Sequence, residues 1–396
     1  WLDCPGDSRS AKVRGCQWAL CLRAPNKSKN EKSVMNKQSI QIALAYMSVV
    51  IGGGFASGQE VLQFFTGYGL IGIIGTLVSG LMFAFLGMQI ARMSSKMQAS
   101  SHKEVLYILF GARLGLVVDV VLSFFLYGVG VVMLAGSGSI FAQQYDLPPL
   151  FGGVLMSVLV IATLCMNVKR IIDLISAVMP FLLAMVLIIT TYSIFSYNAP
   201  IETLDAVARE NNETVTGNWF VGALLYASFN IAVGFPMLAV IGGMTKQPKA
   251  AALGGVLGGL GLGALILLLN IGLFANINQL QGIEMPSLAL AGRISPILSV
   301  VMSVALVCMV YSTAVGMFFA FSARFSKPET SRFKLISAVT VCVGLGLSLG
   351  GFSKLVGTVY PLLGYVGFAL ILAICFNWVR GRSAAKAQKA ALDAVS

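Results

Sequence analysis

The sequence predicts an all-α integral membrane protein of about ten transmembrane helices, arranged as two inverted five-helix repeats with discontinuous first and sixth helices. Three observations predict this class. The 396 residues are 57% apolar or aromatic and only 11% charged, the apolar residues fall into ten long runs, and a residue pattern recurs after 180 positions. Soluble domains are about half apolar and a quarter charged. The composition therefore excludes an ordinary soluble enzyme, a disordered chain and a nucleic-acid-binding domain.

The ten apolar runs are each long enough to cross a bilayer, since a spanning helix needs about 20 mostly apolar residues. They cover roughly 38–67, 70–91, 114–142, 148–166, 171–195, 219–244, 250–275, 291–323, 333–350 and 355–379. The predicted organisation is an N-terminal tail (1–36), a first repeat (37–195), an extracellular loop (196–218), a second repeat (219–380) and a C-terminal tail (381–396). Residues 1–34 are polar and basic without an apolar core, so they are no secretory signal. Met35 resembles a natural start, and we expect the preceding stretch to be an upstream extension.

The basic residues predict the orientation, because cytoplasmic loops of membrane proteins carry an excess of Lys and Arg. With both termini in the cytoplasm, 24 of the 27 Lys and Arg fall on the cytoplasmic side. Only Arg209, Arg293 and Lys354 then lie outside. The net charge of +12 therefore reflects topology in a cell membrane, and we expect no nucleic-acid partner.

The internal repeat is visible in the first and sixth runs. Shifting the chain by 180 residues superimposes Leu44, Tyr46, Ser48, Ile51, Gly54 and Phe55 on Leu224, Tyr226, Ser228, Ile231, Gly234 and Phe235. A repeat of five spans is odd-numbered, so the second copy must enter the membrane upside down. Inverted repeats place a binding site near the midplane, at discontinuous helices in matching positions of the two halves.

Both matching positions carry helix-breaking residues. Gly52–Gly54 are poor helix formers, at about 1 kcal/mol each relative to Ala, and Ser57 and Glu60 have the spacing of a capping box at a new helix start. The sixth run contains Gly234 and Pro236, and Asn230 lies shortly before them. We expect breaks at 52–57 and 230–236. The spaced glycines of the seventh run, Gly255, Gly259 and Gly263, indicate close helix packing instead.

The motif of the first run resembles a known family. Gly-Gly-Gly-Phe-Ala-Ser-Gly-Gln-Glu at 52–60, ahead of Phe64-Phe65 and Tyr68-Gly69, is similar to the first-helix motif of the YkvI family, within the amino acid–polyamine–organocation (APC) transporter superfamily. The resemblance extends over about 37–380. It implies a LeuT-type five-plus-five fold and secondary transport, and it leaves the substrate open.

Acidic residues inside the spans are candidates for coupling. Glu60 lies near the middle of the membrane, where burying a carboxylate costs free energy, so that such a residue is a candidate for a functional role. The alternative is that Glu60 simply caps the Ser57 N–H. A carboxylate at a helix start favours an amine, a cation or a proton over an anionic ligand. Asp119 and Asp173 lie near the cytoplasmic boundary, close to Arg113, Lys169 and Arg170 in sequence or topology. A gate or a topology-fixing ion pair is favoured for them over a proton relay.

A sodium site is implied by the resemblance. In LeuT-like sodium transporters two neighbouring hydroxyls of the eighth helix meet carbonyls of the first helix just before its break. Carried onto this chain, the ligands would be the hydroxyls of Ser312 and Thr313 and the carbonyls of Ser48, Ile51 and Met309. The alternative for the two hydroxyls is bonding to the preceding turn of their own helix. The fifth run lacks the central lysine of some proton-coupled relatives, which favours sodium.

The predicted function is a secondary active symporter, coupled to sodium or protons, for an amino acid or another small amine-containing solute. Expected substrate contacts lie around the two breaks and on the third span, at Gly53, Gly54, Phe55, Ser57, Tyr127, Ser228 and Asn230. Tyr127 could equally be a packed core residue. The alternatives are an uncoupled exchanger or facilitator, a channel, and a non-transporting sensor. The single histidine, His102, lies in a loop, and the seven cysteines show no ligand spacing. We therefore expect no enzyme and no cofactor besides the coupling ion.

Overall fold

The computed structural model describes residues 27–99, 101–166, 184–195, 200–210, 214–328 and 330–393. Within these ranges the chain is helical and contains no strand. Seven helices are long and apolar enough to cross a membrane, and two shorter apolar helices, Pro149–Leu164 and Ala184–Phe195, accompany them. With the interrupted first helix, these helices correspond to the ten predicted spans.

The first repeat contains α2 (Lys27–Val50), α3 (Gly53–Ser57), α4 (Gln59–Phe64), α5 (Ile71–Met97), α6 (His102–Tyr145) and α7 (Pro149–Leu164). The second contains α10 (Trp219–Met244), α11 (Pro248–Ala275), α13 (Pro296–Ser322), α14 (Ser331–Ser348) and α15 (Phe352–Asp393). Two short helices, α9 (Ile201–Glu210) and α12 (Pro286–Ile294), lie in the long connections before α10 and α13. The predicted run 291–323 is therefore divided at Ser295, which caps α13 by accepting from the N–H of Ile297.

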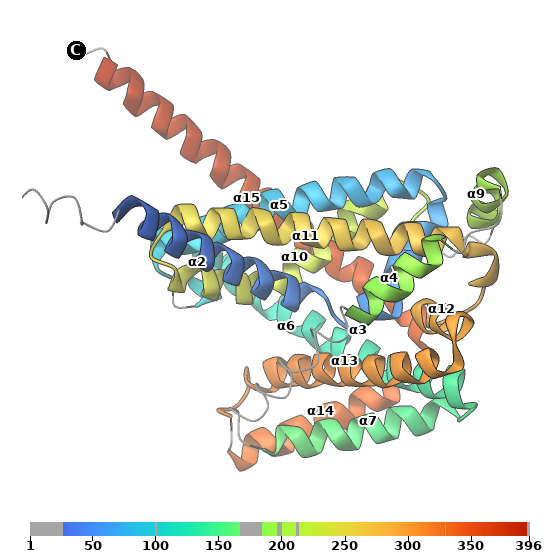
Figure 1. The fold of residues 1–396 in the computed structure, drawn as a ribbon. Helices are drawn as coiled ribbons and strands as arrows, with labels where there is room; N and C mark the ends of the chain where they lie inside the picture. Colours follow the sequence, from blue (N-terminus) through green and yellow to red (C-terminus); the bar gives the residue numbers. More distant parts are fainter. Residues whose placement is uncertain are drawn as a thin grey trace, which may run out of the picture.

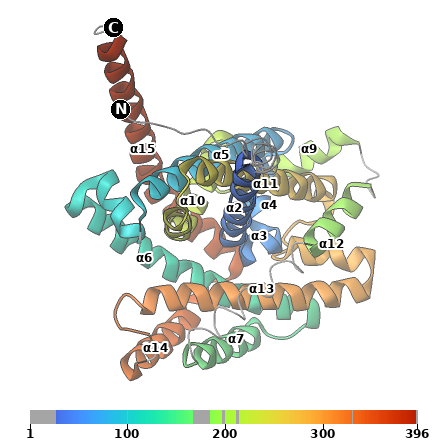
Figure 2. The same ribbon diagram turned by 60° about the vertical axis from the view of Figure 1, so that its left-hand side comes forward.

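The helices form two groups (Figures 1 and 2). Helices α2, α5, α10 and α11 pack together, and α6, α7, α13 and α14 pack together beside them. Each of these helices contacts its counterpart from the other repeat: α2 contacts α10, α5 contacts α11, α6 contacts α13, and α7 contacts α14. This pairing is what an inverted repeat requires. The short helix α3 contacts α6 and α13 of the second group, and α4 contacts α10 and α11 of the first group.

The spaced glycines allow the closest helix contact, as predicted. A Cβ added at Gly259 would overlap the backbone of Ala84, and one added at Gly263 would lie 2.6 Å from the Cα of Gly80. Small residues let membrane helices approach until their backbones touch. The pairing of α5 with α11 is therefore fixed by residues that leave no room for a side chain.

Candidate functional site

The first span is interrupted twice within eight residues. The regular helix ends with the hydrogen bond from Ile51 N to Met47 O (2.9 Å), and Gly52 is extended (φ −111°, ψ −174°). After the five residues of α3, Gly58 takes the left-handed conformation (φ 84°) and starts α4. The prediction of a break is confirmed. The helix is interrupted before α3, at Gly52, and after it, at Gly58. The predicted segment 52–57 is therefore mostly helical, with the breaks at its two ends.

Helix α13 meets the break. The N–H of Gly53 donates to Thr313 Oγ1 (3.3 Å) instead of to the carbonyl of Val49, its partner in a continuous helix. The Ser312 hydroxyl donates to Met309 O within its own helix (2.9 Å). Ile51, Met309 and Ser312 are buried, whereas the side chain of Ser48 is exposed. Thr313 is thus the predicted sodium ligand that touches the broken helix, and Ser312 follows the alternative of bonding to its own helix.

Glu60 is buried, with 5% of its surface exposed, in the first turn of α4. Its carboxylate accepts a hydrogen bond from the Tyr360 hydroxyl of α15. A Cβ added at Gly54 would overlap the carboxylate and lie 2.9 Å from Tyr360 Oη. Only a glycine at position 54 leaves room for this pair.

The predicted capping box is wrong. The N-cap of α4 is Gly58, which makes no side-chain cap hydrogen bond, so Ser57 is not the N-cap residue. The Ser57 hydroxyl donates to Gly54 O (2.7 Å) and accepts from Gln59 N (3.2 Å). Because Gly58 turns the chain between Ser57 and α4, the Glu60 carboxylate does not cap the Ser57 N–H and instead accepts from the Tyr360 hydroxyl.

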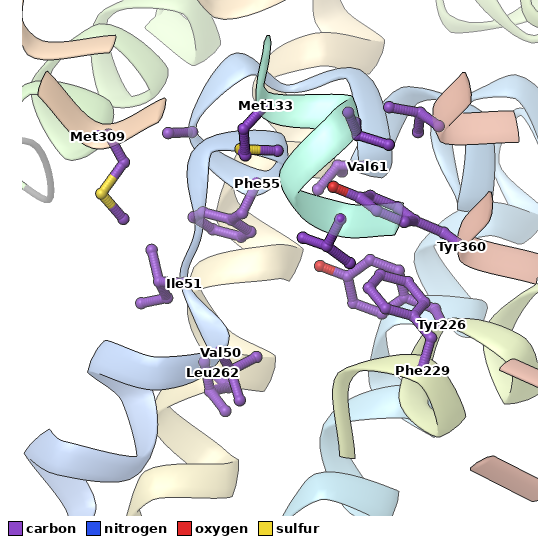
Figure 3. Packing of buried hydrophobic residues seen from close by; sticks show 14 of the residues in the cluster. Val50, Ile51, Phe55, Val61, Met133, Tyr226, Phe229, Leu262, Met309 and Tyr360 are labelled. Atoms are coloured by element: carbon purple, nitrogen blue, oxygen red, sulfur yellow. The ribbon is translucent and has the colours of Figure 1, made fainter. Parts of the chain in front are cut away.

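A small cavity of about 30 Å³ lies at this point, between the break and helices α6, α10, α13 and α15. Its polar walls come from the glycine run and from four side chains, Glu60, Asn230, Thr313 and Tyr360. Its apolar walls include Val129, Met133 and Phe229. Figure 3 shows Met133 over the broken segment and the Tyr360 ring beside Phe229, with ring centroids 4.8 Å apart. One water needs about 10–15 Å³ on this measure, so the cavity admits a cation or one or two waters, and not an amino acid.

The predicted break in the sixth span is wrong. Helix α10 runs without interruption from Trp219 to Met244 and contains Pro236. Pro236 removes one backbone donor, and a transmembrane helix tolerates this when its surroundings compensate. Gly234 lies close to α2, since an added Cβ would be 3.2 Å from Val50. The glycine therefore serves helix packing and not unwinding.

The predicted substrate residues do not all meet at the cavity. Gly53, Gly54 and Asn230 line it. Ser228 is buried against α15 and donates to Gly364 O (2.5 Å). Tyr127 donates to Thr340 O (3.0 Å) and packs on Phe318, so it faces α13 and α14. Phe55 is buried beside the break (Figure 3), and Ser57 bonds within its own turn.

Asp119 belongs to a separate ionic cluster at the end of α13. It lies 3.0 Å from His102 Nε2, 3.5 Å from Lys103 Nζ and 2.5 Å from Arg324 Nη1. A kink at Gly111 (φ 77°, ψ 170°) separates the start of α6 from the part of the helix that holds Asp119. The expected partner Arg113 is replaced by Arg324, two residues beyond the end of α13, and by His102, which the sequence had left without a role. Asp173, Lys169 and Arg170 lie outside the described residues.

Sequence reasoning missed the aromatic side of the cavity, formed by Tyr360 and Phe229. Neither residue has a sequence signal of its own, since both are aromatic positions within apolar spans.

Solved structures share this helix arrangement. MhsT in complex with L-phenylalanine has a TM-score of 0.51 at 16% identity, over 82% of this chain and 87% of that chain. A Na⁺-coupled sialic acid symporter also has a TM-score of 0.51, at 15% identity, over 87% of this chain and 86% of that chain. At such low identity the similarity shows the fold alone. The protein has the LeuT-type membrane fold.

In sequence, the chain is similar to the uncharacterized membrane protein YkvI of Bacillus subtilis (strain 168). The two are 26% identical over 347 residues, which cover 87% of this chain and 97% of YkvI. The resemblance drawn from the motif at 52–60 is confirmed. No protein-family model matches the chain.

Proposed function

We propose that the protein is a secondary transporter that couples a cation to the movement of a small amine-containing solute, an amino acid being the first class to test. The observation that carries the proposal is the buried Glu60 carboxylate, which lies at a broken helix beside a polar cavity in the middle of a LeuT-type fold. A carboxylate in this place favours cationic ligands. Unwound backbone inside a membrane is tolerated where it lines a cavity, as it does here.

A sodium ion is the coupling cation that we favour. Sodium prefers oxygen ligands, and the break leaves the Val49 carbonyl without its helical donor while bringing Thr313 Oγ1 to Gly53. Ser312 Oγ and Met309 O lie 2.9 Å apart on the same helix. Two ligands of one ion can be this close. The hydroxyls of Ser312 and Thr313 and nearby carbonyls would hold the ion, and Ser48 and Ile51 would contribute through their carbonyls.

A proton is the second candidate, and one contact favours it. The hydrogen bond between Glu60 and Tyr360 links a buried carboxylate to a hydroxyl across the cavity. A carboxylate that binds and releases a proton at this position would carry the coupling without a metal ion.

The size of the cavity supports alternating access. About 30 Å³ does not admit an amino acid, so a solute that binds Glu60 requires the walls to separate. The walls come from both helix groups. The broken segment connects them, because α3 contacts α6 and α13 and α4 contacts α10 and α11. Motion of one group against the other would open the cavity, as expected of inverted-repeat transporters.

The experiment uses purified protein in proteoliposomes and a panel of the twenty radiolabelled amino acids. We expect uptake of one class driven by an inward sodium gradient, and loss of the sodium dependence in the double variant Ser312→Ala/Thr313→Ala. Ser157→Ala is the matched control, because Ser157 is also buried and donates to its own helix, at Gly153 O (2.8 Å). Uptake that is equal in sodium and potassium but follows a pH gradient would refute sodium coupling.

Glu60→Gln tests the carboxylate itself. The variant keeps the size of the side chain and removes the charge, so we expect folded protein that no longer accumulates solute. Glu202→Gln, on the exposed face of α9, is the control. Normal accumulation by Glu60→Gln at every pH would contradict the role of Glu60 under either coupling ion.

A further inference from the structure

A second and larger cavity lies away from the Glu60 site. Its volume is about 530 Å³, and it is an open pocket lined by the end of α6, the loop before α12, α12 itself and the start of α13. It shares no lining residue with the Glu60 cavity. Ligand sites typically measure 300–1,000 Å³, so this cavity can hold a whole small solute. The charge pattern predicts that this end of the bundle faces outside.

A single carboxylate, Glu284, lines this cavity. Its one recorded hydrogen bond comes from the Ser139 hydroxyl of α6. Among the ion pairs of the described residues, none involves Glu284. An ionised carboxyl group accepts several hydrogen bonds, so Glu284 can accept from a donor in the pocket in addition to Ser139.

The walls around Glu284 are held in place by neighbouring amides. Gln143 donates to Met285 O and accepts from Met285 N, both at 3.0 Å, which fixes the residue after Glu284 to α6. Gln144 Oε1 accepts from the Ser299 hydroxyl of α13 (2.6 Å). The cavity thus has a fixed anionic group on one wall and apolar surface from Leu288 and Ala289.

We propose that this cavity binds a solute with a cationic amine or guanidinium group, which pairs with Glu284 while its carbon chain lies against Leu288 and Ala289. A charged hydrogen bond to a carboxylate is about twice as strong as a neutral one, which makes the positive group the specific element of recognition. The site does not depend on the proposed transport function, because it is defined by binding alone.

The site is also connected to the broken helix. Pro286 and Ser287 follow Glu284 closely in the chain and lie against Gly58, where an added Cβ would be 3.2 Å from Pro286 Cβ and 2.9 Å from Ser287 Oγ. The segment 284–287 therefore lines the cavity at one end and touches the turn between α3 and α4 at the other.

The experiment measures binding to purified full-length protein in nanodiscs of uncharged lipids. A fluorescent reporter is attached to Gln281→Cys, at the exposed rim of the loop, in a chain whose native cysteines are serine. Three probes of equal size are titrated: butylammonium, 1-butanol and butyrate. We expect a saturable response to butylammonium only. In Glu284→Gln its apparent affinity should fall about tenfold or more, the value of one charged hydrogen bond, and in the control Glu202→Gln it should stay unchanged.

Ala289→Phe gives a second readout that does not touch the charge. It fills the cavity and should also weaken butylammonium binding, so it decides the matter if Glu284→Gln does not yield folded protein. The response should persist in Glu60→Gln, which separates this site from the Glu60 cavity. The proposal is overturned if 1-butanol or butyrate gives the same response as butylammonium, or if Glu284→Gln or Ala289→Phe binds like the wild type.

Discussion

Replacing Gly54 with alanine would put one methyl group where the Glu60 carboxylate lies. The added Cβ would overlap a carboxylate oxygen, lie 2.7 Å from the carboxylate carbon and lie 2.9 Å from Tyr360 Oη. Non-bonded carbon atoms pack at about 3.5–4.0 Å. The Glu60 side chain or the whole of α3 must therefore move by about 1 Å, and the bond to Tyr360 is disturbed in either case.

The expected magnitude follows from the cost of overpacking. An extra methyl group in a well-packed site costs about 1–3 kcal/mol. If the solute-binding conformation is destabilised by this amount, the affinity for solute drops by about 5- to 150-fold, the factor that corresponds to this free energy. The fold should survive, because the change is confined to the cavity wall.

The assay compares, for three single variants, the KM of the solute that the transport panel identifies. Gly346→Ala is the first control, because Gly346 does not line the cavity and an added Cβ would have no atom within 4 Å. Gly316→Ala has open space around it and controls for alanine in a membrane helix. A KM for Gly54→Ala within twofold of both controls would refute the assignment of the cavity as the solute site.

Three further outcomes are expected. Gly259→Leu would force α11 away from α5 at a cost of about 3 kcal/mol and should lower the thermal unfolding midpoint. The control Gly346→Ala, in open space, should leave the midpoint unchanged. Equal midpoints for the two variants would contradict the close packing of α5 and α11. Asp119→Asn leaves Arg324 without its carboxylate and should lower the free energy of unfolding by about 3 kcal/mol. Adding Arg324→Gln should recover part of this loss. No recovery would mean that the two residues do not act as a pair. Tyr360→Phe should raise the KM for solute without changing the unfolding midpoint, and an unchanged KM would remove the hydroxyl from the site.

The break in the first span was predictable because its cause is local. Three successive glycines weaken the helix at their own position, and Gly58 supplies a left-handed turn that other residues rarely adopt. The sixth span also carries a glycine and a proline, but there the packing against neighbouring helices determines whether the helix breaks. Gly234 is packed against Val50, and α10 continues through Pro236.

Partners that are distant in sequence could not be predicted from one chain. Asp119 pairs with Arg324, 205 residues away, although Arg113 is much nearer in sequence. Glu60 meets Tyr360 of the last span, which no local pattern indicates. Ser57 and Glu60 have the spacing of a capping box in the sequence. They do not form one in the structure, because Gly58 turns the chain between the two residues.

Solute counterflow in proteoliposomes tests the central claim most directly. Vesicles loaded with one unlabelled amino acid at high concentration are diluted into trace label of the same compound, for each member of the panel. A carrier that exposes its site alternately to the two sides accumulates the label transiently above its equilibrium level. We expect this overshoot for the wild type and its loss in Gly54→Ala. Label that equilibrates without overshoot, or an overshoot of equal size in Gly54→Ala, would contradict a carrier that works through the Glu60 cavity.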